Sequence, residues 1–190
     1  MAFDIQCGEF IQILHDGHGH WLTISSIGAS KEVKEIFVYD SMYHSIGTYT
    51  KKQIAALVSS QEKEIVIKMM NVQLQAGGCD CGLFAIAFAT ALANGIQPGE
   101  CSFKQDAMRR HLYQCLNNGK MTMFPLLKPR RCGMLVKSTD NIEIYCICRM
   151  PEVPPMVECS KCRQWYHVQC VSVPKMALED SSIEWTCPNC

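Results

Sequence analysis

The sequence predicts an α+β domain followed by a small cysteine-rich module. Short apolar strand patterns alternate with helical patterns up to about residue 127, and cysteines crowd the last 45 residues. A turn-forming stretch over residues 128–133 separates the two parts. We expect the first domain to span residues 1–137 and the second residues 138–190, with residues 137–141 as a polar linker.

The composition is that of a globular protein. The chain has 190 residues, of which 48% are hydrophobic and 19% charged. It has no apolar run of 18 residues and no signal-peptide pattern, so we expect no membrane partner. Thirteen cysteines without a secretion signal indicate metal binding and catalysis rather than disulfides.

The charge is unevenly distributed between the two predicted domains. Residues 1–137 carry 14 basic and 11 acidic residues, a net charge of +3. Residues 138–190 carry 4 basic and 7 acidic residues, a net charge of −3. An acidic module matches a basic peptide better than it matches phosphates, so we expect no direct binding of nucleic acid.

Periodicity places the elements of the first domain. Period-2 apolar patterns predict strands, and patterns of period 3.6 predict helices. The helix at 81–93 is apolar nearly all round, which predicts a buried central helix that ends at Asn94-Gly95. The expected strands are 10–14, 21–25, 36–39 and 64–68, and the expected helices are 51–58, 81–93 and 103–116.

The cysteine-rich module carries eight metal-ligand residues. Zinc takes four such ligands in a tetrahedron, so eight ligands predict two zinc ions with a structural role. Spacing alone leaves open whether the ligand pairs bind sequentially or interleave. The eight are Cys146, Cys148, Cys159, Cys162, His167, Cys170, Cys187 and Cys190.

This ligand order, with a histidine in fifth place, resembles that of plant homeodomain (PHD) fingers. The resemblance implies a cross-brace, in which Cys146, Cys148, His167 and Cys170 hold one zinc and the other four ligands hold the second. RING-type fingers, which recruit ubiquitin-conjugating enzymes, are the alternative. Trp185 lies two residues before Cys187, where PHD fingers keep a core aromatic residue, and favours the PHD interpretation.

Three further residues resemble the methyl-lysine cage of PHD fingers that bind trimethylated lysine 4 of histone H3. Tyr145, Met156 and Trp165 occupy the cage positions. The resemblance implies cation–π binding of a methylated ammonium, the histone H3 tail as a partner, and a nuclear location. The position that is often acidic in such fingers is Ser160 here, with Glu152 and Glu158 as the nearest substitutes.

The first domain contains a candidate cysteine nucleophile. Cys81 opens the predicted helix 81–93, where the helix dipole and free backbone amides favour a thiolate. A base and an orienting acceptor are also needed, and His20 and Asp40 lie at the ends of predicted strands. His18 is an alternative base and Cys79 an alternative nucleophile.

The order of these residues resembles the family of SUMO proteases and adenain, the adenovirus protease. The resemblance implies a papain-like-superfamily fold, with a central helix against a mixed sheet and no catalytic cofactor. It implies a triad of His20, Asp40 and Cys81, with Gln75 as the oxyanion donor. The family's N-terminal lobe is expected to be short or missing. The matching segments are His20-Trp21, Tyr39-Asp40-Ser41-Met42 and Gln75-Ala76-Gly77-Gly78-Cys79-Asp80-Cys81-Gly82.

Together the two resemblances predict a cysteine protease directed to chromatin. Its substrates would be conjugates of a ubiquitin-like modifier or a precursor polyprotein. The fusion itself resembles those of mobile genetic elements, by analogy alone. A catalytically inert chromatin reader and a RING-like ubiquitin ligase adaptor are the alternatives.

Overall fold

A computed structural model describes residues 8–30, 34–58, 62–127, 135–180 and 183–190. The turn-forming stretch predicted over residues 128–133 lies outside the described residues. No helix in these ranges is long and apolar enough to cross a membrane.

The first part of the chain forms a five-stranded mixed sheet in the order β1-β2-β3-β4-β5. Only β3 and β4 are parallel, because the helix α1 (Thr48–Leu57) connects them as a crossover. The other neighbouring pairs are antiparallel. The strands are β1 (Ile11–His15), β2 (Trp21–Ser25), β3 (Glu35–Tyr39), β4 (Glu64–Met70) and β5 (Val136–Glu143).

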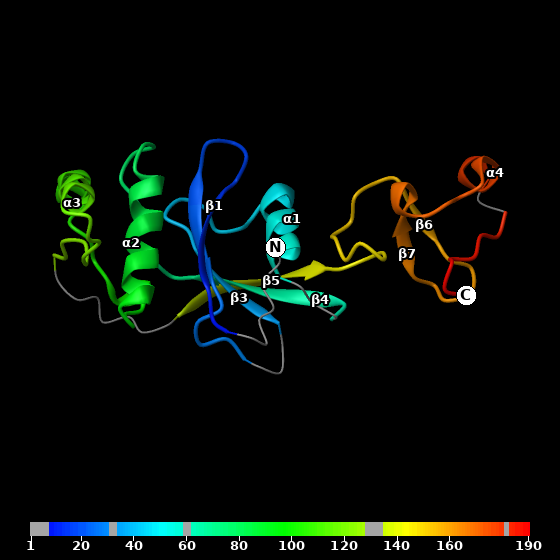
Figure 1. The fold of residues 1–190 in the computed structure, drawn as a ribbon, viewed down its shortest axis with the longest axis horizontal. Helices are drawn as coiled ribbons and strands as arrows, with labels where there is room; N and C mark the ends of the chain where they lie inside the picture. The colour runs from blue at the N-terminus through cyan, green and yellow to red at the C-terminus, as the bar shows by residue number, and fades with distance from the viewer. Residues whose placement is uncertain (1–7, 31–33, 59–61, 128–134, 181–182) are drawn as a thin grey trace.

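Helices cover both faces of the sheet, with α1 on one side and α2 (Cys81–Ala93) and α3 (Gln105–Asn117) on the other (Figure 1). The alternation of side chains along β3 shows this division. Ile36 and Val38 belong to the core cluster under α1, whereas Phe37 and Tyr39 belong to the cluster under α2. A short 3-10 helix, η2 (Pro98–Glu100), connects α2 to α3.

The predicted central helix is confirmed with the predicted bounds. Nine of the 13 residues of α2 are buried. Phe84 and Phe88 contact each other with ring centroids 5.8 Å apart, and both contact Phe103. These contacts join α2 to the segment that leads into α3, and the contact of Phe88 with Tyr39 of β3, with ring centroids 6.5 Å apart, joins it to the sheet.

The polar stretch predicted to be a linker, residues 137–141, is instead part of strand β5. It pairs with β4 along its length, and only Ile142 of β5 is buried. A strand at the edge of a sheet with a solvated face has no apolar alternation, so its pattern was indistinguishable from a linker. The division of the chain at residue 137 stays a prediction.

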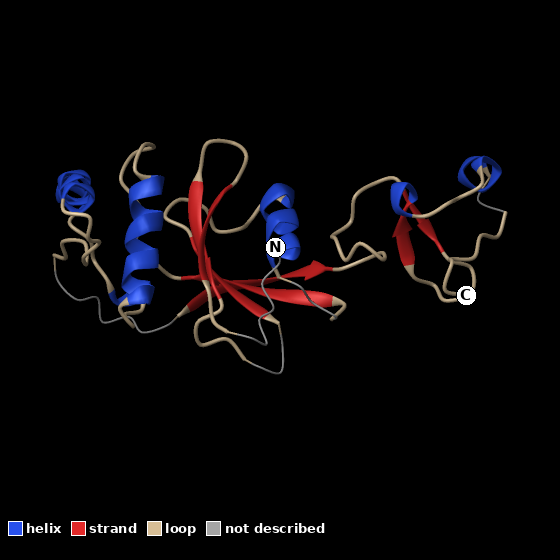
Figure 2. Cartoon of the chain, viewed as in Figure 1, coloured by secondary structure: helices blue, strands red, loops and turns tan. Residues whose placement is uncertain are grey.

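The C-terminal module has little regular structure (Figure 2). Strands β6 (Met156–Glu158) and β7 (Trp165–His167) form a two-stranded antiparallel sheet, followed by η3 (Val168–Cys170) and α4 (Lys175–Glu179). Its core is a cluster of four buried residues: Cys159, Tyr166, Trp185 and Cys187. So small a core cannot stabilise the module without metal.

The placement of β5 predicts that Ile142→Ala destabilises the first domain. Ile142 is 1% exposed and lies opposite Ile65 of β4. Its truncation leaves a cavity and should lower the free energy of unfolding by about 2–4 kcal/mol in urea denaturation. Val136→Ala, at an exposed position of the same strand, is the control. Equal, small losses for both variants would show that β5 does not belong to the core.

Candidate functional site

The first turn of α2 packs directly against the beginning of β2. The Thr23 hydroxyl donates to the carbonyl of Ala85 (2.7 Å), which ties the strand to the helix. Closer to the helix start, a Cβ on Gly82 would lie 3.7 Å from Cδ1 of Trp21. This is an ordinary van der Waals distance, so the indole lies close to the helix backbone at Gly82. Through these contacts His20-Trp21 and Cys81-Gly82 become neighbours.

His20 and Asp40 form a buried pair at the ends of their strands. His20 Nε2 lies 2.9 Å from Asp40 Oδ1, and both residues are buried. The same carboxylate oxygen accepts the backbone N–H groups of Met42 (2.7 Å) and Tyr43 (2.9 Å), which fix its orientation. With Nε2 donating to Asp40, the imidazole carries its proton on that side and Nδ1 is an acceptor.

Nδ1 of His20 is itself buried and has no hydrogen-bond partner among the described residues. A buried polar atom without a partner costs free energy and often marks a functional site. Cys81 lies at the start of α2, is 7% exposed, and has a free thiol. Catalytic hydrogen bonds are often long in a free enzyme. An unpartnered ring nitrogen of this kind can accept the proton of a thiol.

The structure separates the alternative residues from this pair. His18 is exposed in the turn between β1 and β2, where its backbone N–H donates to Asp16 Oδ1 (2.7 Å). Partial burial raises the pKa of Asp16, but the backbone N–H groups of His20 and His18 outweigh it, so the net shift is downward. Cys79 is exposed and precedes the helix, unlike Cys81.

Ser41, which follows Asp40 in the chain, holds Gln75 beside that residue. The Ser41 hydroxyl donates to Gln75 Oε1 (2.7 Å), and the backbone N–H of Gln75 donates to the Ser41 carbonyl (2.9 Å). These contacts orient the amide, and its Nε2 donates to the Gly77 carbonyl (2.9 Å). An amide nitrogen has two N–H groups, so one remains for a substrate oxygen. Ser41 belongs to the matching segment Tyr39-Asp40-Ser41-Met42, although the sequence alone indicated no role for it.

The eight predicted metal ligands gather into two clusters. Cys146, Cys148, His167 and Cys170 form one, and Cys159, Cys162, Cys187 and Cys190 form the other, with all ligand atoms of a cluster within 4.8 Å of one another. This is the interleaved pairing.

The donor atoms fit zinc. A tetrahedral site with Zn–S bonds of about 2.3 Å places sulfur atoms about 3.8 Å apart. The Sγ atoms of Cys159 and Cys190 are 3.8 Å apart, as are those of Cys162 and Cys187. In the other cluster, His167 Nε2 lies 3.0 Å from the Pro151 carbonyl and Nδ1 lies 3.1 Å from Cys148 Sγ. The carbonyl fixes the tautomer that directs Nδ1 to a metal.

The predicted cage residues come from adjacent backbone segments. Met156 lies opposite His167, and Trp165 lies opposite Glu158, so Met156 and Trp165 are diagonal neighbours on one face of the finger's sheet. The backbone N–H of Cys146 donates to the Trp165 carbonyl (3.1 Å), which places Tyr145 next to β7.

The side chains at these positions differ in freedom. Trp165 is 44% exposed, as a ligand-binding ring requires. The Tyr145 hydroxyl donates to Glu143, and this hydrogen bond, with smaller effects of burial and Glu152, raises the pKa of Tyr145 to about 12. The phenol therefore stays neutral at physiological pH. Trp185 is buried against Tyr166, as expected of a core aromatic residue.

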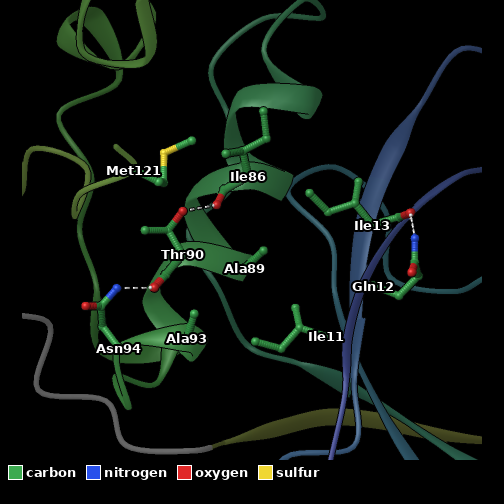
Figure 3. A pocket seen from close by; sticks show the side chains of 9 residues that line it. All are labelled: Ile11, Gln12, Ile13, Ile86, Ala89, Thr90, Ala93, Asn94 and Met121. Carbon is green, nitrogen blue, oxygen red and sulfur yellow. Dashed lines mark hydrogen bonds between the residues drawn. The ribbon is translucent and has the colours of Figure 1, made fainter. Parts of the chain in front are cut away.

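A separate apolar groove of about 550 Å³ lies between β1 and the C-terminal half of α2 (Figure 3). Its polar groups bond to one another, since Thr90 donates to the Ile86 carbonyl and Asn94 donates to the Thr90 carbonyl. None of its lining residues is a predicted site residue. The groove is therefore not part of the candidate catalytic site.

The fold and the two sets of residues define a papain-type α+β domain joined to a cross-brace finger. Residues 10–118 match the family model described as "Ulp1 protease family, C-terminal catalytic domain", and residues 146–190 match the model described as "PHD-finger". The chain belongs to the Ulp1 protease family. The predicted fold class and the fusion of protease domain and finger are confirmed, and the RING-like interpretation of the finger is replaced by the PHD match.

Shorter stretches are similar to curated proteins. One is the "Lid2 complex component lid2" of Schizosaccharomyces pombe, with 43% identity over 47 residues, covering 25% of this chain and 3% of that protein. Another is the "Lysine-specific demethylase phf2" of Danio rerio, with 43% identity over 52 residues, covering 26% and 5%. The "Lysine-specific demethylase 5B" of Gallus gallus is 37% identical over 59 residues, covering 30% and 4%. The chain thus spans only a few per cent of the length of these relatives.

The metal clusters predict two zinc ions per chain and their loss in acid. Burial raises the pKa of the Cys159 thiol, but the backbone N–H groups of Cys162, Cys187 and Lys161 outweigh it and lower that pKa to about 6. The lowered pKa keeps this thiol ionised, and therefore ready to bind metal, down to a pH of about 6, and protons compete with zinc for it only as the pH falls further. A chromogenic chelator should detect zinc release over that range.

Removal of one ligand tests the same assignment at neutral pH. Cys159→Ser should lower the zinc content by one ion per chain in elemental analysis, because it breaks one cluster. The control is Cys79→Ser, which alters an exposed thiol outside both clusters and should leave the zinc content unchanged. Equal zinc contents in the two variants would contradict the assignment.

Proposed function

We propose that this chain is a cysteine isopeptidase or processing protease that a PHD finger directs to chromatin. Its substrates would be SUMO-like conjugates or a precursor polyprotein. The observation that carries the proposal is the buried His20–Asp40 pair, whose Nδ1 has no hydrogen-bond partner among the described residues, while the adjacent Trp21 lies close to Gly82 at the start of α2. Membership of the Ulp1 protease family supports the same reaction class.

In the proposed mechanism His20 acts as base and then as acid. Its Nε2–H donates to Asp40, so Nδ1 accepts the proton of the Cys81 thiol. The Cys81 thiolate attacks the scissile carbonyl, which we expect to belong to a glycine. The protonated Nδ1 then gives its proton to the leaving amine, and water attacks the remaining thioester to release the acid. No cofactor takes part.

Two donors would stabilise the charge that develops on the carbonyl oxygen. The backbone N–H of Cys81 lies in the first turn of α2, where helix N–H groups have no intrahelical acceptor. The Gln75 amide, oriented by Ser41, offers its second N–H. Such preoriented donors commonly contribute more to the rate than any other group.

The finger would direct the enzyme to its site of action by binding a histone tail. Tyr145, Met156 and Trp165 would enclose a methylated ammonium, with each favourable ring contributing about 1–2 kcal/mol. Two proteins that share a similar stretch are named lysine-specific demethylases, which supports a connection with methylated lysine. Zinc, held by the two clusters, would fix the finger's fold. Histone binding would place the protein in the nucleus.

Covalent labelling tests the proposed enzyme. SUMO carrying a C-terminal vinyl sulfone should label wild-type protein and the Cys79→Ala control, and Cys81→Ala should abolish the label. His20→Ala should slow labelling at least about a hundredfold, because the base is lost. Labelling is measured as a mobility shift on a denaturing gel. A label that persists in Cys81→Ala would refute the assignment, and an unlabelled wild type would favour an inert reader.

Peptide binding tests the proposed address. A histone H3 tail peptide trimethylated at lysine 4 should bind more tightly than the unmethylated peptide in fluorescence anisotropy. Trp165→Ala should weaken binding of the methylated peptide about tenfold or more, because a cation–π contact is lost. Trp165→Phe, which keeps a ring, should retain part of the difference. Equal binding of both peptides to the wild type would contradict the cage.

A further inference from the structure

The side chain of Gln105 in α3 forms hydrogen bonds with the loop that precedes Cys81. Gln105 Oε1 accepts the backbone N–H of Ala76 (2.8 Å), and its Nε2 donates to the Ala76 carbonyl (2.9 Å). The same Nε2 donates to Asp80 Oδ2 (2.8 Å). One amide thus joins both ends of the segment that runs from Gln75 to the nucleophile.

Arg109, one turn further along α3, binds the other oxygen of the same carboxylate. Its guanidinium Nη2 lies 2.7 Å from Asp80 Oδ1. Gln105 and Arg109 therefore occupy both oxygens of Asp80. This places the charge of Asp80 on the side of α3.

The position of Asp80 makes this arrangement unusual. Asp80 is the N-cap of α2, since its carbonyl accepts the first intrahelical bond, from the N–H of Phe84 (3.0 Å). An aspartate at this position normally turns its carboxylate onto the N–H groups of its own helix. Asp80 makes no such side-chain bond, and its backbone, with φ −113° and ψ 9°, lies outside the extended region usual for a capping residue. The first-turn N–H groups, including that of Cys81, therefore face no carboxylate from their own cap.

We propose that Gln105 and Arg109 are positioning residues that hold the Asp80 carboxylate away from the oxyanion site. Without them Asp80 would be free to take up the extended backbone of a capping residue, turn its carboxylate onto α2 and place a negative charge where the substrate oxygen becomes negative. The inference rests on the proposed function of the Cys81 N–H as an oxyanion donor. It adds a role for α3, which contributes no residue to the proposed triad.

The ratio of two reactions of Cys81 tests the proposal. Acylation by p-nitrophenyl acetate passes through a tetrahedral oxyanion, whereas alkylation by iodoacetamide does not. Measuring both at Cys81, in the full chain and by tandem mass spectrometry, corrects for changes in thiol reactivity. In Gln105→Ala/Arg109→Ala the ratio of acylation to alkylation should fall about tenfold, a part of the loss seen when an oxyanion donor is removed.

Matched controls lie on the same helix. Gln114→Ala/Arg110→Ala removes the same side-chain types from exposed positions that have no ion pair with Asp80, and it should leave the ratio unchanged. Adding Asp80→Ala to Gln105→Ala/Arg109→Ala should restore most of the ratio, because the displaced carboxylate is then absent. If Gln105 and Arg109 only stabilised the loop, Asp80→Ala would not restore the ratio of acylation to alkylation.

The outcomes separate the inference from the proposed function. If the wild type acylates Cys81 but the ratio is unchanged in Gln105→Ala/Arg109→Ala, or Asp80→Ala does not restore it, the inference is overturned. A wild type in which Cys81 is not acylated contradicts the proposed function instead. In that case, hydrogen exchange tests whether Gln105 and Arg109 keep the Asp80 carboxylate away from α2. The amides of Gly82 and Leu83 should exchange more slowly in Gln105→Ala/Arg109→Ala, where Asp80 caps them, and unchanged exchange overturns the inference.

Discussion

The packing of α2 against β2 determines where every residue of the candidate catalytic site lies. The Trp21 indole lies close to Gly82, and the Thr23 hydroxyl donates to the helix carbonyl of Ala85. These two contacts bring the start of the helix to the start of the strand. The apolar contact of Phe84 and Phe88 with the sheet keeps the helix in this place.

Around that contact the candidate residues come from separate elements. His20 and Asp40 lie at strand ends, Gln75 lies in the loop before α2, and Gln105 of α3 binds that loop. The finger depends on a different constraint, the metal, because its apolar cluster contains only four buried residues among those that the structure describes. Strand β5 connects the two parts: it pairs with β4 and leads directly to Tyr145, whose hydroxyl binds Glu143 at the end of that strand.

Much of this fold could be predicted from the sequence, and the reasons differ from element to element. The bounds of α2 were predictable because its apolar run begins after a Gly-Gly turn and ends at Asn94-Gly95. The two metal clusters followed from ligand order once a cross-brace was assumed. Strand β5 was missed because an edge strand with one buried residue carries no periodic signal.

The candidate site could be predicted only in part, because some of its contacts also leave no periodic signal in the sequence. His20, Asp40 and Cys81 lie at the ends of predictable elements, so their order along the chain carried information. Gln105 and Arg109 contribute through side-chain hydrogen bonds to Asp80 across 25 and 29 residues of sequence, respectively. On a partly exposed helix they are ordinary polar residues, and no local pattern distinguishes them from Arg110 or Gln114. Contacts of this kind appear only when the backbone is known.

The central claim is that His20, Cys81 and Gln75 form one reaction centre, and a structure of a covalent adduct tests it most directly. SUMO ending in a Gly-Gly aldehyde would form a thiohemiacetal with Cys81 that mimics the tetrahedral intermediate. The account predicts the adduct oxygen about 2.7–3.1 Å from both the Cys81 N–H nitrogen and Gln75 Nε2, with His20 Nδ1 facing the sulfur. An adduct whose oxygen points away from both donors, or a His20 ring turned from Cys81, would contradict it.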